Sequence, residues 1–313
     1  MKYTTMILLL FCFLFLAGCA EESAQSEETI SAGLVVTDSG LGDNAFSDLA
    51  FQGLEQARDE LDISFDYREP VDQNYEEHLR TLVEDDHDVI IGLSFNIQEA
   101  MEKVAEEYPE QQFVLIDAES SLENITSITF KEDEGSYLIG MIAAMKTETD
   151  TVGFIGGEEI PVVQKFENGF KEGIQAVSPD TEVLTEYSGT FGDDQLGKEI
   201  AESMIEQNAD YIFPSAGFTG VGALQAADEA GIYAFGVDSD QSFLAEDAVV
   251  TSMTKNLNVA IFDVVEQVAQ GESLTGDTLT LGLAEGGVGL APIRLIDLSP
   301  DQQQMLDERR NAE

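Results

Sequence analysis

Acidic, aromatic and glycine residues follow the predicted strands in both halves of this chain. These residues are Asp38 and Phe46 after a strand at 32–37, Ser94 and Asn96 after 88–93, Asp117 at the end of 112–117, Phe191 after 182–187, Gly217 after 211–214 and Asp238 after 233–237. Parallel α/β sheets bind ligands beyond the carboxyl ends of their strands. The same residue types also serve as turn and cap residues. Taken singly they favour turns, but their recurrence in both halves favours a ligand cleft.

Lys255 is the only basic residue between Lys198 and Arg294, and it follows an apolar strand predicted at 248–253. A chain this poor in lysine has little structural need for a cation at that point. The structural alternative is a surface ion pair, which contributes little stability. We expect Lys255 to contact a ligand.

Groups for catalysis or metal binding are scarce. The two histidines, His78 and His87, lie in acidic surroundings, and we expect both on the solvated surface. Their spacing matches no zinc motif. The glycine-rich runs at 40–42 and 217–222 match neither a phosphate-binding loop nor a dinucleotide fingerprint. The sequence therefore predicts no enzyme activity, no cofactor and no metal.

The charge balance excludes several partners. The chain has 62 acidic and 14 basic residues, a formal net charge of −48. Such a surface repels nucleic acid, whose binding depends on basic contacts to phosphate. It also repels anionic headgroups, so any membrane link must come from lipid. The acidic residues are spread along the chain, which is typical of a solvated halophile-type or alkaliphile-type surface. Cation capture by this surface is the functional alternative.

The N-terminus has the pattern of an export signal. Lys2 precedes an apolar run at 6–15, and Leu16-Ala17-Gly18 precedes Cys19. This pattern resembles a bacterial lipoprotein signal, with residues 1–18 removed and Cys19 lipidated. A retained signal anchor is the alternative, but the run is short for a membrane span. Residues 19–31 are predicted to form a flexible tether.

Short apolar strands alternate with amphipathic helices from residue 31 onward. The predicted strands are 32–37, 63–67, 88–93, 112–117, 125–130, 151–155, 182–187, 211–214, 233–237 and 248–253, and the predicted helices are 47–61, 75–84, 97–108, 134–147, 162–177, 194–207, 219–230 and 258–270. This alternation predicts βαβ units and parallel sheets. A faint repeat of strand, loop and helix in the two halves suggests two similar lobes, although any two βα units look alike.

Several of these segments resemble the basic-membrane-protein family of lipoproteins, the purine nucleoside receptors of ABC importers. The matching runs include Asp38-Ser-Gly-Leu-Gly-Asp43-Asn-Ala-Phe46-Ser47, Glu134-Gly-Ser-Tyr-Leu-Ile-Gly140, Phe191-Gly-Asp-Asp-Gln-Leu-Gly197-Lys, Gly236-Val-Asp238-Ser-Asp240 and Val250-Thr-Ser-Met-Thr-Lys255. They follow one another in order across residues 32–295. The loop Ser94-Phe95-Asn96 departs from the glycine-rich loop of the family.

The resemblance implies a type I periplasmic-binding-protein fold, with two Rossmann-like α/β lobes joined by a three-stranded hinge. The N-terminal lobe would comprise 32–130 plus 252–280, and the C-terminal lobe 131–251 plus 281–313. By family analogy, Phe46 and Phe191 would sandwich a nucleobase, and Asp117 would bind the base edge with Ser94 or Asn96. Asp238 and Lys255 would hold the ribose, with Gly217 allowing close approach. Asp38 belongs to the same expected site.

The sequence thus predicts a monomeric, lipid-anchored extracellular protein that captures purine nucleosides and delivers them to an ABC permease. Two alternatives remain: a sensory or regulatory lipoprotein of the same family, and a binding protein for a sugar or another small polar solute.

Overall fold

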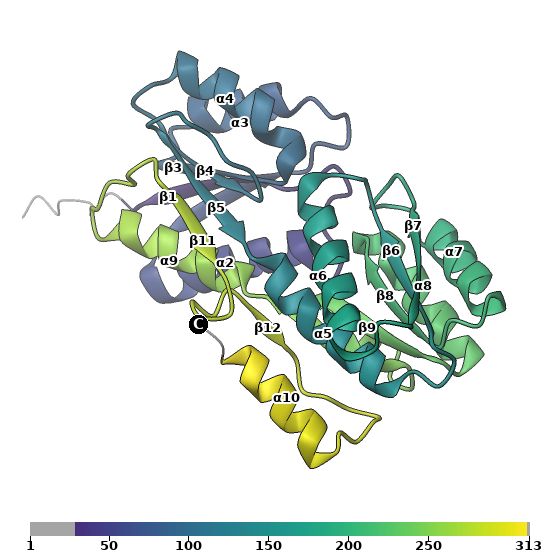
Figure 1. Cartoon of the computed structure of the whole chain (residues 1–313). Helices are drawn as coiled ribbons and strands as arrows, with labels where there is room; N and C mark the ends of the chain where they lie inside the picture. Colours follow the sequence, from purple (N-terminus) through teal and green to yellow (C-terminus); the bar gives the residue numbers. More distant parts are fainter. Residues whose placement is uncertain (1–28, 312–313) are drawn as a thin grey trace, which may run out of the picture.

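The computed structural model describes residues 29–311, which form two α/β lobes (Figure 1). Each lobe is built on a six-stranded sheet, with strand order β11-β5-β4-β3-β1-β2 in the first and β12-β10-β9-β8-β6-β7 in the second. All strand pairs are parallel except β10 with β12. This arrangement confirms the predicted two-lobed α/β fold.

The first lobe contains β1 (Ser31–Val35), α2 (Phe46–Leu61), β2 (Ser64–Arg68), α3 (Tyr75–Glu84), β3 (Val89–Leu93), η1 (Phe95–Ile97), α4 (Gln98–Glu107), β4 (Gln112–Ile116), β5 (Ile125–Phe130), α9 (Leu257–Ala269) and β11 (Thr278–Leu281). The second contains α5 (Glu132–Lys146), β6 (Thr151–Gly156), α6 (Pro161–Val177), β7 (Glu182–Tyr187), α7 (Asp194–Glu206), β8 (Tyr211–Ser215), α8 (Gly217–Ala230), β9 (Tyr233–Asp238), η2 (Gln241–Leu244), β10 (Val249–Lys255), β12 (Val288–Leu290) and α10 (Pro300–Arg310).

Both faces of the first sheet are covered by helices, which explains its continuous apolar strands. Successive side chains of a strand point to opposite faces, so Leu34 and Val35 of β1 enter different cores. Leu34 packs in the core that includes α2 and α9, and Val35 packs in the core under α3 and α4. Figure 1 shows α3 and α4 on one side of the sheet and α2 and α9 on the other.

The chain crosses between the lobes three times, at 130–132, 255–257 and 281–288. Backbone hydrogen bonds join the crossings. The Lys131 amide donates to the Leu281 carbonyl at 3.0 Å, and the Asn256 amide donates to the Gly287 carbonyl at 2.8 Å. These bonds confirm the predicted three-stranded hinge. The ligand-facing loops of both sheets lie beside this hinge.

The lobe assignment of residues 252–255 needs correction. β10 runs to Lys255 and pairs with β9 and β12, so residues 252–255 belong to the second sheet and not to the first lobe. The predicted strand ends at 253, where the polar residues Thr254 and Lys255 follow. Strand pairing is made by the backbone, however, and β10 continues through both residues: Thr254 pairs with Asp238 and Gly289, and Lys255 pairs with Val288.

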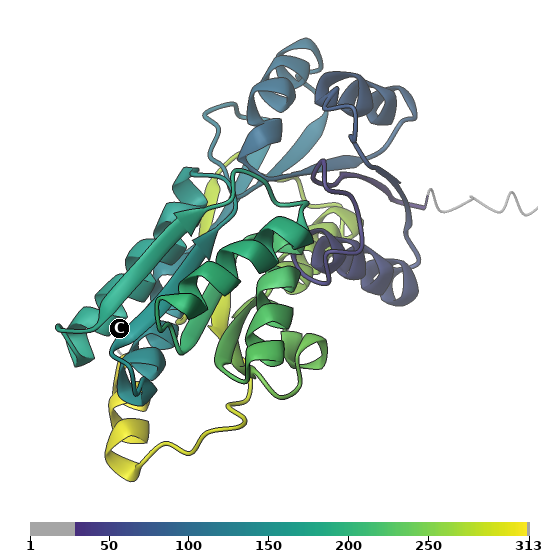
Figure 2. The same cartoon turned by 90° about the vertical axis from the view of Figure 1, so that its right-hand side faces the viewer.

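The sequence does not predict β11, β12 and α10, nor the short 3-10 helices η1 and η2. The two strands are short, at four and three residues, and mostly solvent-exposed or at a sheet edge. Helix α10, drawn in yellow, lies against α5 at the far end of the second lobe (Figures 1 and 2). It begins with a capping box, in which Ser299 Oγ accepts from the Gln302 amide and the Gln302 side chain accepts from the Ser299 amide. That box, with Pro300 at the first turn, is a readable helix start.

Within residues 29–311, no helix is both long enough and apolar enough to cross a membrane. The predicted signal at 1–18, Cys19 and most of the predicted tether lie outside the described residues.

Candidate functional site

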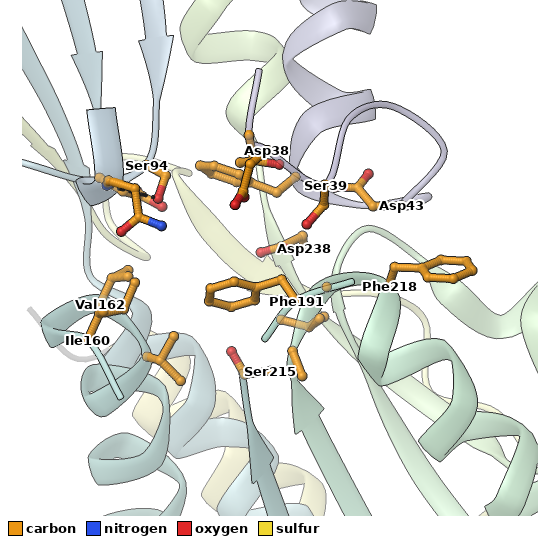
Figure 3. A pocket seen from close by; sticks show the side chains of 18 of the residues that line it. Asp38, Ser39, Asp43, Ser94, Ile160, Val162, Phe191, Ser215, Phe218 and Asp238 are labelled. Atoms are coloured by element: carbon orange, nitrogen blue, oxygen red, sulfur yellow. Dashed lines mark hydrogen bonds between the residues drawn. The ribbon is translucent and has the colours of Figure 1, made fainter. Parts of the chain in front are cut away.

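One cavity lies where the carboxyl ends of the two sheets face each other across the hinge (Figure 3). It contains about 740 Å³ of space, part of it open to solvent. Every site residue expected from the sequence lines it: Asp38, Phe46, Ser94, Asn96, Asp117, Phe191, Gly217, Asp238 and Lys255. The first five come from the first lobe and the last four from the second, so the fold brings both groups together.

Three of these residues other than glycine have a left-handed backbone. Ser94, Asp117 and Asp238, at the ends of β3, β4 and β9, have φ of 80°, 64° and 63°. Asp tolerates this region, but Ser94 combines φ 80° with ψ 158°, a conformation that glycine almost alone adopts. Each such residue costs on the order of 1–3 kcal/mol. The Ser94 hydroxyl itself accepts from the Asn96 amide at 3.4 Å.

Lys255 is buried in the cavity wall, with 2% of its surface exposed. Its Nζ donates to Asp117 Oδ2 at 2.6 Å and to Glu132 Oε1 at 3.0 Å. It also lies 5.0 Å from the centre of the Phe46 ring and 4.7 Å from that of Phe130. Burial opposes the charge, but the neighbouring carboxylates raise the pKa of Lys255 above its ordinary value. The residue is therefore a buried cation.

Glu132 is a member of this cluster that the sequence analysis missed. It is fully buried at the first residue of α5, on the first crossing of the hinge. Its Oε2 lies 3.3 Å from Lys165 Nζ of α6, and the same Lys165 Nζ donates to the Phe130 carbonyl at 3.1 Å. Glu132 thus lies between two lysines, Lys255 on β10 and Lys165 on α6. Its sequence context, Lys131-Glu132-Asp133-Glu134, gives no signal of burial because its partner Lys255 is 123 residues away.

The two aspartates beside Lys255 have raised pKa values. Burial and the charge of Glu132 raise the pKa of Asp117 to about 6, against the opposing effect of Lys255. Its Oδ1 is buried and has no hydrogen-bond partner among the described residues. Burial, with the charges of Asp117 and Asp43, raises the pKa of Asp238 to about 7, again opposed by Lys255. No described residue donates a hydrogen bond to the Asp238 carboxylate, which points into the cavity in Figure 3. These oxygens are free acceptors.

Asp117 lies closer to Lys255 than the expected roles imply. The family analogy assigns Asp117 to the base and Lys255 to the ribose. Because Asp117 Oδ2 is 2.6 Å from Lys255 Nζ, ligand atoms that contact these two residues must be neighbours.

The Phe191 ring projects into the centre of the cavity from the loop after β7 (Figure 3). Two glycines make room for it. A Cβ on Gly157 would lie 2.2 Å from the ring atom Cε1, and a Cβ on Gly217 would lie 3.3 Å from Phe191 Cβ. Gly217 also has φ +55°, which favours glycine. The sequence predicts that Gly217 allows a ligand to approach closely. In the structure the group that lies close to Gly217 is the Phe191 side chain. Phe46 comes from the first lobe and Phe191 from the second, so aromatic rings line the cavity from both sides.

Further lining residues were not nominated from the sequence. Ile160 and Val162 form an apolar wall below Ser94 in Figure 3, whereas Phe218 points away from the cavity centre. Asp43 is buried, and its carboxylate accepts from the amides of Ala45 and Ser47, which shapes the loop before Phe46. An Asp that precedes a helix by two or three residues is a readable cap signal. The wall residues carry no comparable signal.

The lobes touch at the mouth of the cavity. Ser239 Oγ, just after β9, donates to the Asn44 carbonyl in the loop after β1 at 2.7 Å. This bond joins the two lobes outside the hinge crossings. The cavity is lined by residues of both lobes.

One expectation about the histidines is wrong. His78 is partly exposed and lies 3.0 Å from Asp72 Oδ1, as a surface residue would. His87 is buried, with 8% of its surface exposed. The sequence analysis placed it at the surface because Asp85 and Asp86 precede it, but the residue begins the turn into β3 and its ring packs inward.

Two lobes, a hinge of three crossings and a cleft lined from both sides define a solute-binding protein. A solved ABC transporter solute-binding protein from Aeropyrum pernix superposes with a TM-score of 0.83, at 29% identity over 90% of each chain. A lipoprotein of unknown function from Pyrococcus furiosus is 32% identical over 292 residues, 88% of this chain and 73% of that protein. The protein named ABC transporter nucleoside-binding protein BmpA of Lactococcus lactis is 28% identical over 303 residues, 88% of this chain and 86% of that protein.

A family model described as ABC transporter substrate-binding protein PnrA-like matches residues 30–312. The chain belongs to this family, and the predicted resemblance to basic membrane proteins is confirmed. The family is one of substrate-binding proteins of ABC transporters rather than a class of enzymes.

Proposed function

We propose that this protein is a lipid-anchored extracellular receptor that captures purine nucleosides for an ABC importer. The observation that carries the proposal is the composition of the closed cavity. It combines aromatic rings from both lobes with free carboxylate oxygens on Asp117 and Asp238 beside a buried lysine. A flat base suits stacking between rings, and the hydroxyls of a ribose suit carboxylate acceptors.

The charges in the cavity favour an uncharged ligand. Four aspartates line it, namely Asp38, Asp43, Asp117 and Asp238, and Lys255 is the only basic residue among the lining residues. That lysine is already paired with Asp117 and Glu132. A phosphate would face uncompensated carboxylates, so a nucleoside is favoured over a nucleotide.

A thermal-shift screen tests the ligand class. Inosine, guanosine and adenosine should raise the melting temperature, and ribose, free bases and common sugars should raise it less. A shift with a sugar alone would replace the nucleoside assignment by the sugar-binding alternative. The absence of any shift with nucleosides would overturn the proposal.

The lipid anchor has a separate test. Cys19→Ser should release the protein from the membrane or leave an unprocessed precursor, because the only other cysteine, Cys12, lies within the predicted signal. Normal membrane retention of a cleaved Cys19→Ser chain would contradict the anchor and leave the ligand proposal intact.

A further inference from the structure

The His87 ring lacks the partners that a buried imidazole needs. It is 8% exposed, and both ring nitrogens are buried without a hydrogen-bond partner among the described residues. The backbone of His87 does have a partner, since its carbonyl accepts a hydrogen bond from Gln111 Nε2 at 2.9 Å. Only the ring lacks partners. A buried polar group left unpaired costs free energy and calls for an explanation, such as a bound ion.

The ring faces two carboxylates on a different part of the fold from the cleft. Asp66 lies on the edge strand β2, and Asp85 and His87 lie in the turn between α3 and β3. Their ligand atoms all lie within 4.8 Å of one another. His87 Nε2 is 3.9 Å from Asp66 Oδ2, too far for a hydrogen bond. Ligands about 2.0–2.2 Å from a tetrahedral ion lie about 3.4 Å apart, so a small closure of this cluster suffices.

The electrostatics at this point favour a cation. Helix α3 ends beside this cluster, and its last turn contains no basic residue. The negative end of the helix dipole is therefore not compensated within the helix. Four charged groups act on His87. Three are acidic, Asp66, Asp85 and Asp88, and one is basic, Arg68.

Arg68 provides the present counter-charge. Its guanidinium lies 2.9 Å from Asp85 Oδ2 and 3.9 Å from Asp66 Oδ2. The side chains of Asp66 and Asp85 are 60% and 48% exposed, so these pairs are weak and the arginine can turn toward solvent. It leaves both His87 ring nitrogens without a partner, and an entering ion would coordinate one of them.

We propose that Asp66, Asp85 and His87 form a second binding site, for a divalent ion of the zinc class, which ties the edge strand β2 to the turn before β3. One nitrogen and two carboxylate oxygens, with water in a fourth position, suit Zn²⁺. The nitrogen ligand disfavours Ca²⁺ and Mg²⁺, which take oxygen ligands.

The chain offers a matched control, because it contains only two histidines. Zn²⁺ is titrated into the purified full chain against a chromophoric chelator, for the wild type, His87→Ala and His78→Ala. We expect one Zn²⁺ per chain at micromolar affinity, at least tenfold weaker binding in His87→Ala, and no change in His78→Ala. Zn²⁺ should also raise the melting temperature of the wild type and of His78→Ala only.

Two further variants keep the test decisive if His87→Ala fails to fold. Asp66→Asn and Asp85→Asn change exposed side chains, and each should weaken Zn²⁺ binding at least tenfold. Equal binding by the wild type and these variants, or loss of binding in His78→Ala, would overturn the site. So would uptake of many ions without saturation, since that behaviour indicates the general acidic surface.

Discussion

Asp238→Asn is the substitution with the most specific expected consequence. Asn keeps the size of the side chain and one oxygen acceptor but cannot carry charge. The Asp238 carboxylate has no donor among the described residues, so both oxygens are available to two ligand hydroxyls. Hydrogen bonds to charged groups contribute roughly 1.5–3 kcal/mol each, against roughly 0.5–1.5 for neutral ones. Loss of the charge should therefore cost about 2–4 kcal/mol, or roughly 30- to 1,000-fold in Kd.

The same residue should make binding depend on pH. Burial raises the pKa of Asp238 to about 7 in the empty cavity, so below that pH its side chain is mostly protonated. Ligand hydroxyls donate to the ionised form, and binding should release a proton. Affinity should therefore rise with pH up to about 7 and level off above it. In Asp238→Asn the slope above about pH 6 should vanish, and only a contribution from Asp117, whose pKa is about 6, should remain below.

Calorimetry in two buffers of different ionisation enthalpy counts the released protons directly. The wild type should release close to one proton on binding a nucleoside at pH 6, and Asp238→Asn should release fewer. An Asn variant that matches the wild type in both Kd and proton release would refute this account of the carboxylate.

Four further outcomes are expected. Phe191→Ala should weaken nucleoside binding by about 1–3 kcal/mol through lost stacking and leave ribose binding unchanged, and equal losses for both ligands would count against the stacking role. Lys255→Met should lower the free energy of unfolding by about 3–5 kcal/mol, because it leaves buried carboxylates without a counter-charge. Adding Glu132→Gln to Lys255→Met should restore part of that loss, whereas additive losses in denaturant melts would argue against the pairing. The empty protein should lose stability as pH rises from about 4 to about 7. Burial holds the pKa of Asp238 above its ordinary 3.8, so in this range the folded state keeps a proton that the unfolded chain releases. A flat curve of stability against pH would contradict the raised pKa. Raising sodium chloride from millimolar to molar levels should raise the melting temperature, because salt screens the repulsion among the charges of a chain with a net charge of −48. Sodium sulfate is the comparison for salting-out. A melting temperature that does not change with sodium chloride would contradict this charge repulsion.

The lining of the cleft was predictable because it follows from local rules. Asp38, Asp117 and Asp238 all follow apolar strands, and parallel sheets gather such positions at one edge. β5, β7 and α3 have the bounds that the sequence predicts, because apolar periodicity and turn residues mark them on both sides. The cavity thus collects every residue that strand ends nominated.

The residues that were missed depend on contacts far apart in the chain. Glu132 is buried only because Lys255 and Lys165 reach it from two other elements. His87 follows two aspartates, a context typical of a surface turn, yet its ring is covered by the packing of β2 against that turn. Neither environment can be read from flanking residues.

Isothermal titration of one protein sample with inosine, guanosine, adenosine, ribose and the free bases tests the central claim most directly. The wild type should bind at least one of the three nucleosides more tightly than ribose or any free base, because the proposed site offers Phe46 and Phe191 to the base and Asp238 to the sugar. Asp238→Ala should weaken that binding by about 2–4 kcal/mol. No nucleoside binding, or equal binding by the wild type and Asp238→Ala, would contradict the nucleoside-receptor account.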